Sequence, residues 1–187
     1  LNDREEKFFK DTLNYIPVWN DVASDAITIV VNSKSPDTLF TLDHLKQQLT
    51  GGLGKKQTIV FDGLSATSTV RFAVDSILRG EKFDTSVVKA VKNSREVLEY
   101  VASNPDAIGF VGISWIGNPE DTAQVKMLKK IKMAYVRCDN CTDSPYVKPT
   151  QLGILAHRYP LVRGLYYIVK ENYNGLGSAF AAFLQYE

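Results

Sequence analysis

Short apolar runs rich in β-branched residues alternate along this chain with amphipathic stretches, and this alternation limits the fold more than any other feature. AITIVVN (26–32) and TIVF (58–61) have the composition of buried strands. Between them, Thr41 heads a short helix with leucines on one face. After TIVF, apolar residues recur at helical spacing. The alternation predicts an α/β architecture with a largely parallel sheet.

The remaining elements follow from the same patterns. In the last of them, GLGSAFAAFLQYE, we expect a helix whose bulky apolar side chains face inward, namely Leu176, Phe180, Phe183 and Leu184. The other expected elements are a helix over 4–13, a strand in SVVKAVKN (86–93), a helix capped by Ser94, and strands at 107–116, 131–136 and 163–170.

Composition argues for a globular protein without affinity for nucleic acid. The 187 residues are 44% hydrophobic and 23% charged, with a net charge of +1. The densest basic stretch is expected to be a solvated surface, and it consists of Lys126, Lys129, Lys130 and Lys132. No apolar run reaches the ~20 residues that a membrane-spanning helix needs, and Leu1 opens on a charged stretch rather than a secretory signal.

The chain has two cysteines, Cys138 and Cys141, in RCDNCTD. A redox pair usually opens a helix, but TDSPYVKP follows here. Zinc would need further ligands, and the only histidines, His44 and His157, lie far away in sequence. We therefore expect a disulfide that braces a loop, or inert thiols, with redox chemistry and metal binding as the alternatives.

A cluster of small and hydroxyl residues follows TIVF and marks the candidate binding site. The helix after it is expected to begin near Ser68, and the free N–H groups of a first helical turn favour an anion. Arg71 could add a forked donor matched to phosphate or a similar oxyanion. The alternative is a helix cap with a polar loop. The cluster consists of Ser65, Ala66, Thr67, Ser68 and Thr69.

Several stretches, in order over nearly the whole chain, resemble the solute-binding proteins of ABC-type phosphate importers. AITIVVNSKSPDTLFTLDHLKQQLTG (26–51) is similar to the family's segment from an inter-lobe strand to a threonine-led helix. NPDAIGFVG (104–112) resembles the family's PGAIGYV strand. YPLVRGLYYIVK (159–170) and SAFAAFLQYE (178–187) are similar to its tyrosine-proline segment and its terminal helix.

The resemblance implies a type II periplasmic-binding-protein fold, in which two α/β lobes with mixed sheets flanked by helices close on a solute. It implies that 1–32 and 134–187 are the remainder of lobe I, and that 33–133 form lobe II with the anion-binding loop. The chain is expected to be truncated at both ends, with lobe I incomplete. Trp19, Trp115 and Tyr166 are then expected in core or inter-lobe packing rather than cleft lining.

The family's anion loop reads R-x-D-G-S-G-T, and the corresponding stretch here is VFDGLSAT (60–67). The resemblance thus implies anion contacts from Ser65 and Thr67, and we add Ser68, Thr69 and Arg71. Asp62 is expected to orient the loop, because a carboxylate repels a dianion unless it accepts a proton from it. The family's arginine position falls on Val60 or Phe61, so a cation is missing there, and Arg71 is the expected replacement.

The function that the resemblance implies is an extracytoplasmic receptor, periplasmic or at the cell surface and lipid-anchored in the full-length protein. It would bind phosphate or a similar oxyanion and deliver it to the membrane permease subunits of an ABC importer, with no cofactor, metal or nucleic acid. The alternative is a ligand-sensing or protein-interaction module on the same fold that no longer binds phosphate. An enzyme is the third reading, and no credible nucleophile–base pair supports it.

Overall fold

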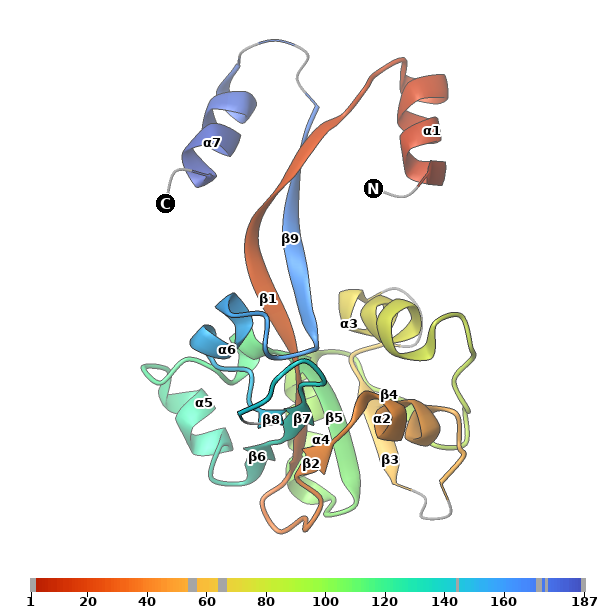
Figure 1. Cartoon of the computed structure of the whole chain (residues 1–187), viewed down its shortest axis with the longest axis vertical. Coiled ribbons are helices and arrows are strands. Elements are labelled where there is room, and N and C mark those ends of the chain that lie inside the picture. The colour runs from red at the N-terminus through yellow and green to blue at the C-terminus, as the bar shows by residue number, and fades with distance from the viewer. Residues whose placement is uncertain are drawn as a thin grey trace. The chain divides into compact units, whose positions relative to one another are not determined.

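The computed structural model describes residues 3–53, 57–63, 67–143, 145–170, 173 and 175–185 (Figure 1). The chain splits into two compact units, which we describe separately. The smaller unit is Leu1–Ser24 with Gly164–Glu187, and the larger is Asp25–Arg163. The lobe boundaries implied by the resemblance, at 33 and 133, stay a prediction. In the part of the chain that the structure describes, no helix is both long enough and apolar enough for a membrane crossing.

The larger unit is built on a mixed sheet in the order β4-β3-β5-β1-β6. Strand β3 is parallel to both β4 and β5, whereas β1 is antiparallel to β5 and β6. The expectation of a largely parallel sheet therefore holds for the pairing of β3 with β4 and β5 and is wrong for the pairing of β1. The alternation of strands and helices predicts parallel pairing only where a helix connects neighbouring strands. The strands are β1 (Val18–Asn32), β3 (Thr58–Phe61), β4 (Val88–Ala90), β5 (Ala107–Gly112) and β6 (Ile131–Met133).

Helices cover both faces of this sheet, and alternate strand residues supply two cores. Along β1, Ile29 packs in one buried cluster and Val30 in the other. In β3, Phe61 likewise packs in the first cluster and Val60 in the second, because successive strand residues point to opposite faces of the sheet. Helices α2 and α3, with the π-helix η1 that continues α3, contribute to the first core, and α4 to the second. Their bounds are α2 (Leu42–Leu49), α3 (Ser68–Phe72), η1 (Ala73–Leu78) and α4 (Ser94–Ser103).

The segment 131–136, expected as one strand, is divided between two sheets. After β6, the N–H of Ala134 donates to the carbonyl of Ile29 at 2.9 Å, and the chain then joins a small sheet in the order β2-β7-β8. Tertiary packing therefore decides the break. The small sheet consists of β2 (Leu39–Phe40), β7 (Tyr135–Arg137) and β8 (Tyr146–Val147), and the helices α5 (Thr122–Met127) and α6 (Gln151–Leu155) complete the unit.

Several expected element ends are displaced, among them the start of β1 at Val18 and both ends of β4. The cap of α4 is Asn93, whose Oδ1 accepts from the Glu96 N–H at 3.0 Å, and Ser94 is the first helical residue. The strand expected over 107–116 ends at Gly112 and gives way to a 3₁₀ turn, η2 (Ile113–Trp115). The expected helix start near Ser68 and the Thr41 cap are both confirmed.

The smaller unit contains α1 (Asp3–Leu13), the first part of β1, most of β9 (Val162–Val169) and α7 (Leu176–Leu184). Strands β1 and β9 pair and run side by side (Figure 1). The Tyr15 hydroxyl donates to the Val169 carbonyl, and the rings of Trp19 and Tyr166 meet edge-to-face at 5.7 Å.

The expectation that the bulky side chains of α7 face inward is wrong. Leu176 is 89% exposed, Phe180 60% and Phe183 64%, and Leu184 is exposed as well. The spacing of apolar residues marks a stripe on a helix, but burial of that stripe requires a second surface that packs on it. Trp19, Trp115 and Tyr166 were expected in core or inter-lobe packing, and all three are exposed, so they lie outside the core and their inter-lobe packing stays a prediction. Lys126, Lys129, Lys130 and Lys132 are exposed as expected.

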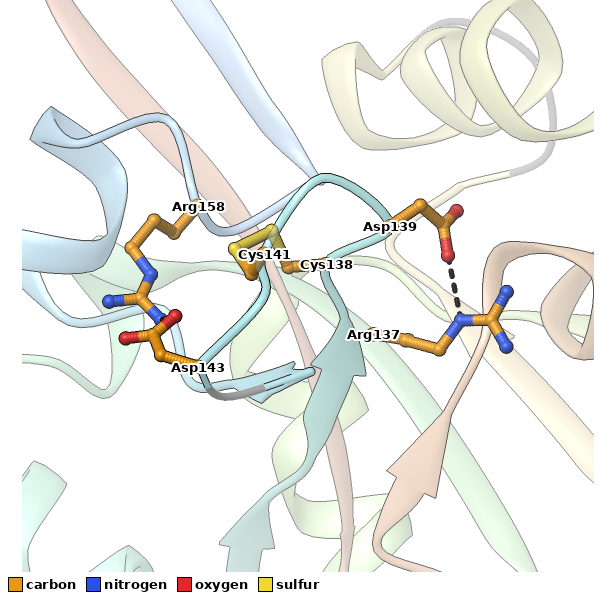
Figure 2. Close-up of a disulfide and its surroundings, with 6 residues drawn as sticks. All are labelled: Arg137, Cys138, Asp139, Cys141, Asp143 and Arg158. Carbon is orange, nitrogen blue, oxygen red and sulfur yellow. Dashed lines mark hydrogen bonds and ion pairs between the residues drawn. A yellow bond between two sulfur atoms is a disulfide. The ribbon is translucent and has the colours of Figure 1, made fainter.

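The two cysteines form a disulfide directly after β7, which confirms the expected loop brace (Figure 2). The Cα atoms of Cys138 and Cys141 are 5.4 Å apart, and the Cys138 N–H donates to the Pro145 carbonyl at 2.6 Å. Ion pairs of 2.7 Å flank the bridge, between Arg137 and Asp139 and between Arg158 and Asp143. The loop is thus fixed by covalent and ionic contacts on both sides.

Candidate functional site

The candidate site is the loop between β3 and α3, and Thr67 closes it. The Thr67 backbone is extended, and its Oγ1 accepts a hydrogen bond from the Val70 N–H at 3.3 Å, as an N-cap does. Gly63 has a φ of +140°, and a Cβ there would lie 2.9 Å from Thr67 Cγ2. Glycine at 63 therefore permits both the backbone turn and the close approach to the cap. Ser65, the expected anion contact next to them, lies outside the described residues.

Asp62 connects the start of this loop to a second helix. Its Oδ2 accepts a hydrogen bond from the Ser94 hydroxyl at 2.9 Å, at the first residue of α4. Its Oδ1 is shielded from solvent and has no hydrogen-bond partner among the described residues. The contact with Ser94 supports the expected role of Asp62 in orienting the loop.

Ser68 contacts Arg163, which is itself paired with Asp25 from the opposite end of the chain segment that forms the larger unit. The Arg163 guanidinium donates from Nη1 to the Ser68 Oγ at 2.8 Å. The same guanidinium donates to the Asp25 Oδ2, from Nε at 2.9 Å and from Nη2 at 2.5 Å. The side chains of Arg163 and Asp25 are only 19% and 13% exposed. The structure thus provides a cation beside the loop. The family's own arginine position, by contrast, holds an apolar residue in this chain, Val60 or Phe61.

The other expected contacts have different surroundings. Thr69 is 3% exposed, so its side chain belongs to the core rather than to the surface of the loop. Arg71 is exposed and lines a cavity of about 450 Å³ together with Val74 and Phe83. The structure therefore brings Ser68 together with Arg163, a residue that we did not expect at the site.

Sequence analysis missed Asp25 and Arg163, although both lie in segments that it singled out. Asp25 directly precedes the buried strand at 26–32, and Arg163 lies within YPLVRGLYYIVK. A charged residue at the edge of an apolar run is the one available signal. Nothing in a single sequence pairs two residues that are 138 positions apart.

A second hollow lies between α4 and α5, and its volume is about 560 Å³. Trp115 and Ser114 line it together with Arg95 and Glu99 of α4. Gln124 of α5 also lines it, and its side-chain Nε2 donates a hydrogen bond to the Ser114 carbonyl at 3.0 Å. In the described ranges, no group of three or more histidine, cysteine or acidic side chains could hold a metal ion.

Comparison with known proteins agrees with the resemblance seen in the sequence. A family model described as a PBP superfamily domain matches residues 3–187. No curated protein matches the chain at a significant level. Among solved structures, an ABC-type phosphate transport receptor from Vibrio cholerae has a TM-score of 0.65 and 20% sequence identity, covering 90% of this chain and 67% of that one.

Two further structures show how widely the fold is used. A phosphate ABC transporter substrate-binding protein with bound phosphate from Clostridium perfringens has a TM-score of 0.70 and 17% identity, covering 98% of this chain and 69% of that one. The regulatory domain of a LysR-family regulator, MetR, from N. meningitidis has a TM-score of 0.52 and 12% identity, covering 90% and 61%. This chain thus spans about two thirds of the length of the transport proteins that it is similar to. The similarity shows a shared type II periplasmic-binding-protein fold.

Proposed function

The chain belongs to the PBP superfamily domain family, and from this premise we propose that it is an extracytoplasmic receptor for phosphate or a similar oxyanion. It would deliver the anion to the permease subunits of an ABC importer and would catalyse no reaction. The proteins from V. cholerae and C. perfringens, which share its fold, are described as a phosphate transport receptor and a phosphate transporter's substrate-binding protein.

The observation that carries the proposal is the meeting of a hydroxyl-rich helix start with a guanidinium. The proposed anion contacts are Ser65, Thr67, Ser68, Thr69 and Arg71. Hydroxyls and backbone N–H groups hold an oxyanion without adding charge, and the first turn of α3 contributes a partial positive charge. Thr69 would contribute its backbone N–H, because its side chain is buried. The Ser68 hydroxyl already accepts from Arg163, so its proton is free to be donated to the anion.

The disulfide supports a location outside the cytoplasm. Cys138 and Cys141 are bridged, and disulfides persist in oxidising compartments such as the periplasm or the cell surface. Lipid anchoring of the full-length protein remains part of the proposal.

The second candidate function is a ligand-sensing or protein-interaction module on the same fold. Two observations favour it. Val60 and Phe61, at the family's arginine position, are both fully buried, and the same fold occurs in the regulatory domain of a transcriptional regulator. Such a module would not bind phosphate.

Calorimetric titration of the chain with phosphate, sulfate, molybdate and an organic anion separates the two candidates. We expect one oxyanion to bind, with at least a tenfold loss of affinity in Ser65→Ala and Ser68→Ala. The matched control is Ser76→Ala, which removes an exposed hydroxyl two turns further along the same helix. Absence of binding for every anion, in calorimetry and in NMR titration to millimolar concentration, would contradict the receptor and favour the sensing module.

A further inference from the structure

Asp25 and Arg163 are the first and last residues of the larger unit, and they form an ion pair with each other. Both donors of Arg163 in this pair, Nε and Nη2, point at the same oxygen of Asp25. A planar guanidinium held at two positions has a fixed orientation. The Arg163 side chain as a whole is largely shielded, since it is only 19% exposed.

The opposite edge of the guanidinium reaches the candidate site. Nη1 donates to Ser68 Oγ at 2.8 Å, and this contact is exposed to solvent. Arg163 has five N–H bonds, and the contacts with Asp25 and Ser68 use three of them. In the described part of the chain, the other two, one on each terminal nitrogen, have no partner. Guanidinium N–H groups are strong hydrogen-bond donors to carboxylate and phosphate oxygens.

Gly112 lies beside the guanidinium. A Cβ at this position would make ordinary contacts with Arg163 Nη2 at 3.5 Å, Ser114 Oγ at 3.6 Å and Asp25 Oδ2 at 3.7 Å. The Gly112 backbone has φ −64° and ψ 145°, a conformation that any residue can adopt. Backbone geometry therefore gives no reason for glycine at 112, and a side chain there would contact the guanidinium.

We propose that Arg163 supplies the cation that contacts the oxyanion, and that Asp25 is a positioning residue that aims it. This inference rests on the proposed receptor function. It assigns to Arg163 the cationic contact with the anion that was expected from Arg71. The cation comes from β9 rather than from the loop of the anion contacts. Because Asp25 offsets the charge of Arg163, hydrogen bonds to the acceptor oxygens of the ligand contribute more to its binding than net charge does.

The test compares phosphate affinity among variants of the whole chain. We expect Arg163→Gln to lower the affinity at least 30-fold and Arg79→Gln, a control that removes an exposed arginine outside the proposed contacts, to change it less than threefold. Arg163→Lys keeps the charge but loses the fork and should retain an intermediate affinity. Asp25→Asn keeps the cation but weakens its orientation, and we expect a loss of five- to tenfold. Thermal unfolding of each variant reports whether it folds.

An NMR titration separates a direct contact from a purely structural role. The Arg163 Nε–H resonance, assigned by its loss in Arg163→Lys, should shift on addition of inorganic phosphate to the unmodified chain. If it does not shift at saturating phosphate, or if Arg71→Gln abolishes binding while Arg163→Gln retains it, the inference is overturned and the receptor function stands. If the unmodified chain binds no anion, both are overturned. Should Arg163→Gln fail to fold, Arg163→Lys and the resonance shift decide.

Discussion

The hydroxyl of Tyr159 donates a hydrogen bond to the carbonyl of Ile27 at 2.9 Å, across 132 positions of sequence. Both residues are 1% exposed and belong to the same buried cluster. The bond connects the segment before β9 to the start of the buried part of β1. It therefore fastens the segment before β9 to the core of the larger unit.

Replacement of Tyr159 by Phe should destabilise the protein by about 1–2 kcal/mol, because a buried carbonyl loses a donor while the ring's packing is kept. Denaturant unfolding of the two proteins measures the difference. The matched control is Tyr166→Phe, since that side chain is 62% exposed, and we expect it to change the free energy of unfolding by less than about 0.5 kcal/mol. An equal effect of the two substitutions would contradict the role given to the Tyr159 bond.

The same tyrosine predicts a loss of stability in alkali. Burial raises the pKa of Tyr159 above its ordinary value of about 10. At a pH between the pKa of Tyr159 in the unfolded chain and its raised pKa in the folded chain, the unfolded chain releases the proton and the folded chain keeps it. The contribution of Tyr159 to stability is therefore complete below about pH 10 and declines above it, by up to about 1.4 kcal/mol per pH unit. Unfolding measured from pH 8 to 11.5 should show a steeper decline for the unmodified protein than for Tyr159→Phe, and parallel curves would refute the claim.

Two threonine caps allow stability to be separated from binding. Thr41 Oγ1 accepts from the His44 N–H at 3.0 Å in α2, as Thr67 Oγ1 does from the Val70 N–H in α3. Thr41→Ala and Thr67→Ala should each cost about 1 kcal/mol of stability. If the β3–α3 loop is the anion site, only Thr67→Ala will also weaken phosphate binding, measured by calorimetry. Equal binding by the two variants would remove Thr67 from the contacts.

Two glycines of β5 should respond differently to alanine. A Cβ at Gly109 would lie 2.7–2.8 Å from Val30, Val97 and Val101, within the core. Gly109→Ala should therefore cost about 1–3 kcal/mol through overpacking. A Cβ at Gly112 meets its nearest neighbour at 3.5 Å, so Gly112→Ala should cost less than about 0.5 kcal/mol. Urea unfolding of both variants checks the contrast, and a tolerated Gly109→Ala would contradict the close packing of α4 on this strand.

The disulfide should contribute modestly to stability because it closes a short loop. Cys138 and Cys141 are three positions apart, and chain-entropy reasoning gives about 2 kcal/mol for a loop of this length. Reduction should lower the midpoint of denaturant unfolding by a corresponding amount. The double variant Cys138→Ser and Cys141→Ser is the control, since it should match the reduced protein and be insensitive to reductant. A midpoint that does not move on reduction would show that the ion pairs alone fix the loop.

Local chemistry allowed the sequence to predict most of the elements. β-Branched runs form β3 and the buried half of β1, and the caps at Thr41 and Thr67 follow from side-chain hydrogen bonds that reach only three residues along the chain. The spacing of Cys138 and Cys141 left the disulfide as one of several possible interpretations. The errors, such as the cap assigned to Ser94, shift element ends by a residue or more.

Burial and long-range pairing could not be predicted in this way. The apolar stripe of α7 is visible in the sequence, but the structure leaves Phe180 and Phe183 exposed. Arg71, close in sequence to the hydroxyl loop, was the expected cation, whereas the structure brings Arg163 to Ser68. Proximity in sequence is a poor guide to proximity in space, because sheet order decides which distant residues meet.

The sequence by itself determined most of the segments that become helices and strands, since hydrophobic periodicity and capping act within a few residues. It also determined that a hydroxyl-rich loop precedes α3. Only the tertiary structure decided that β1 runs antiparallel within the sheet and that Asp25 and Arg163 meet beside Ser68. These relationships depend on the packing of strands across the whole sheet, and that packing joins residues more than a hundred positions apart.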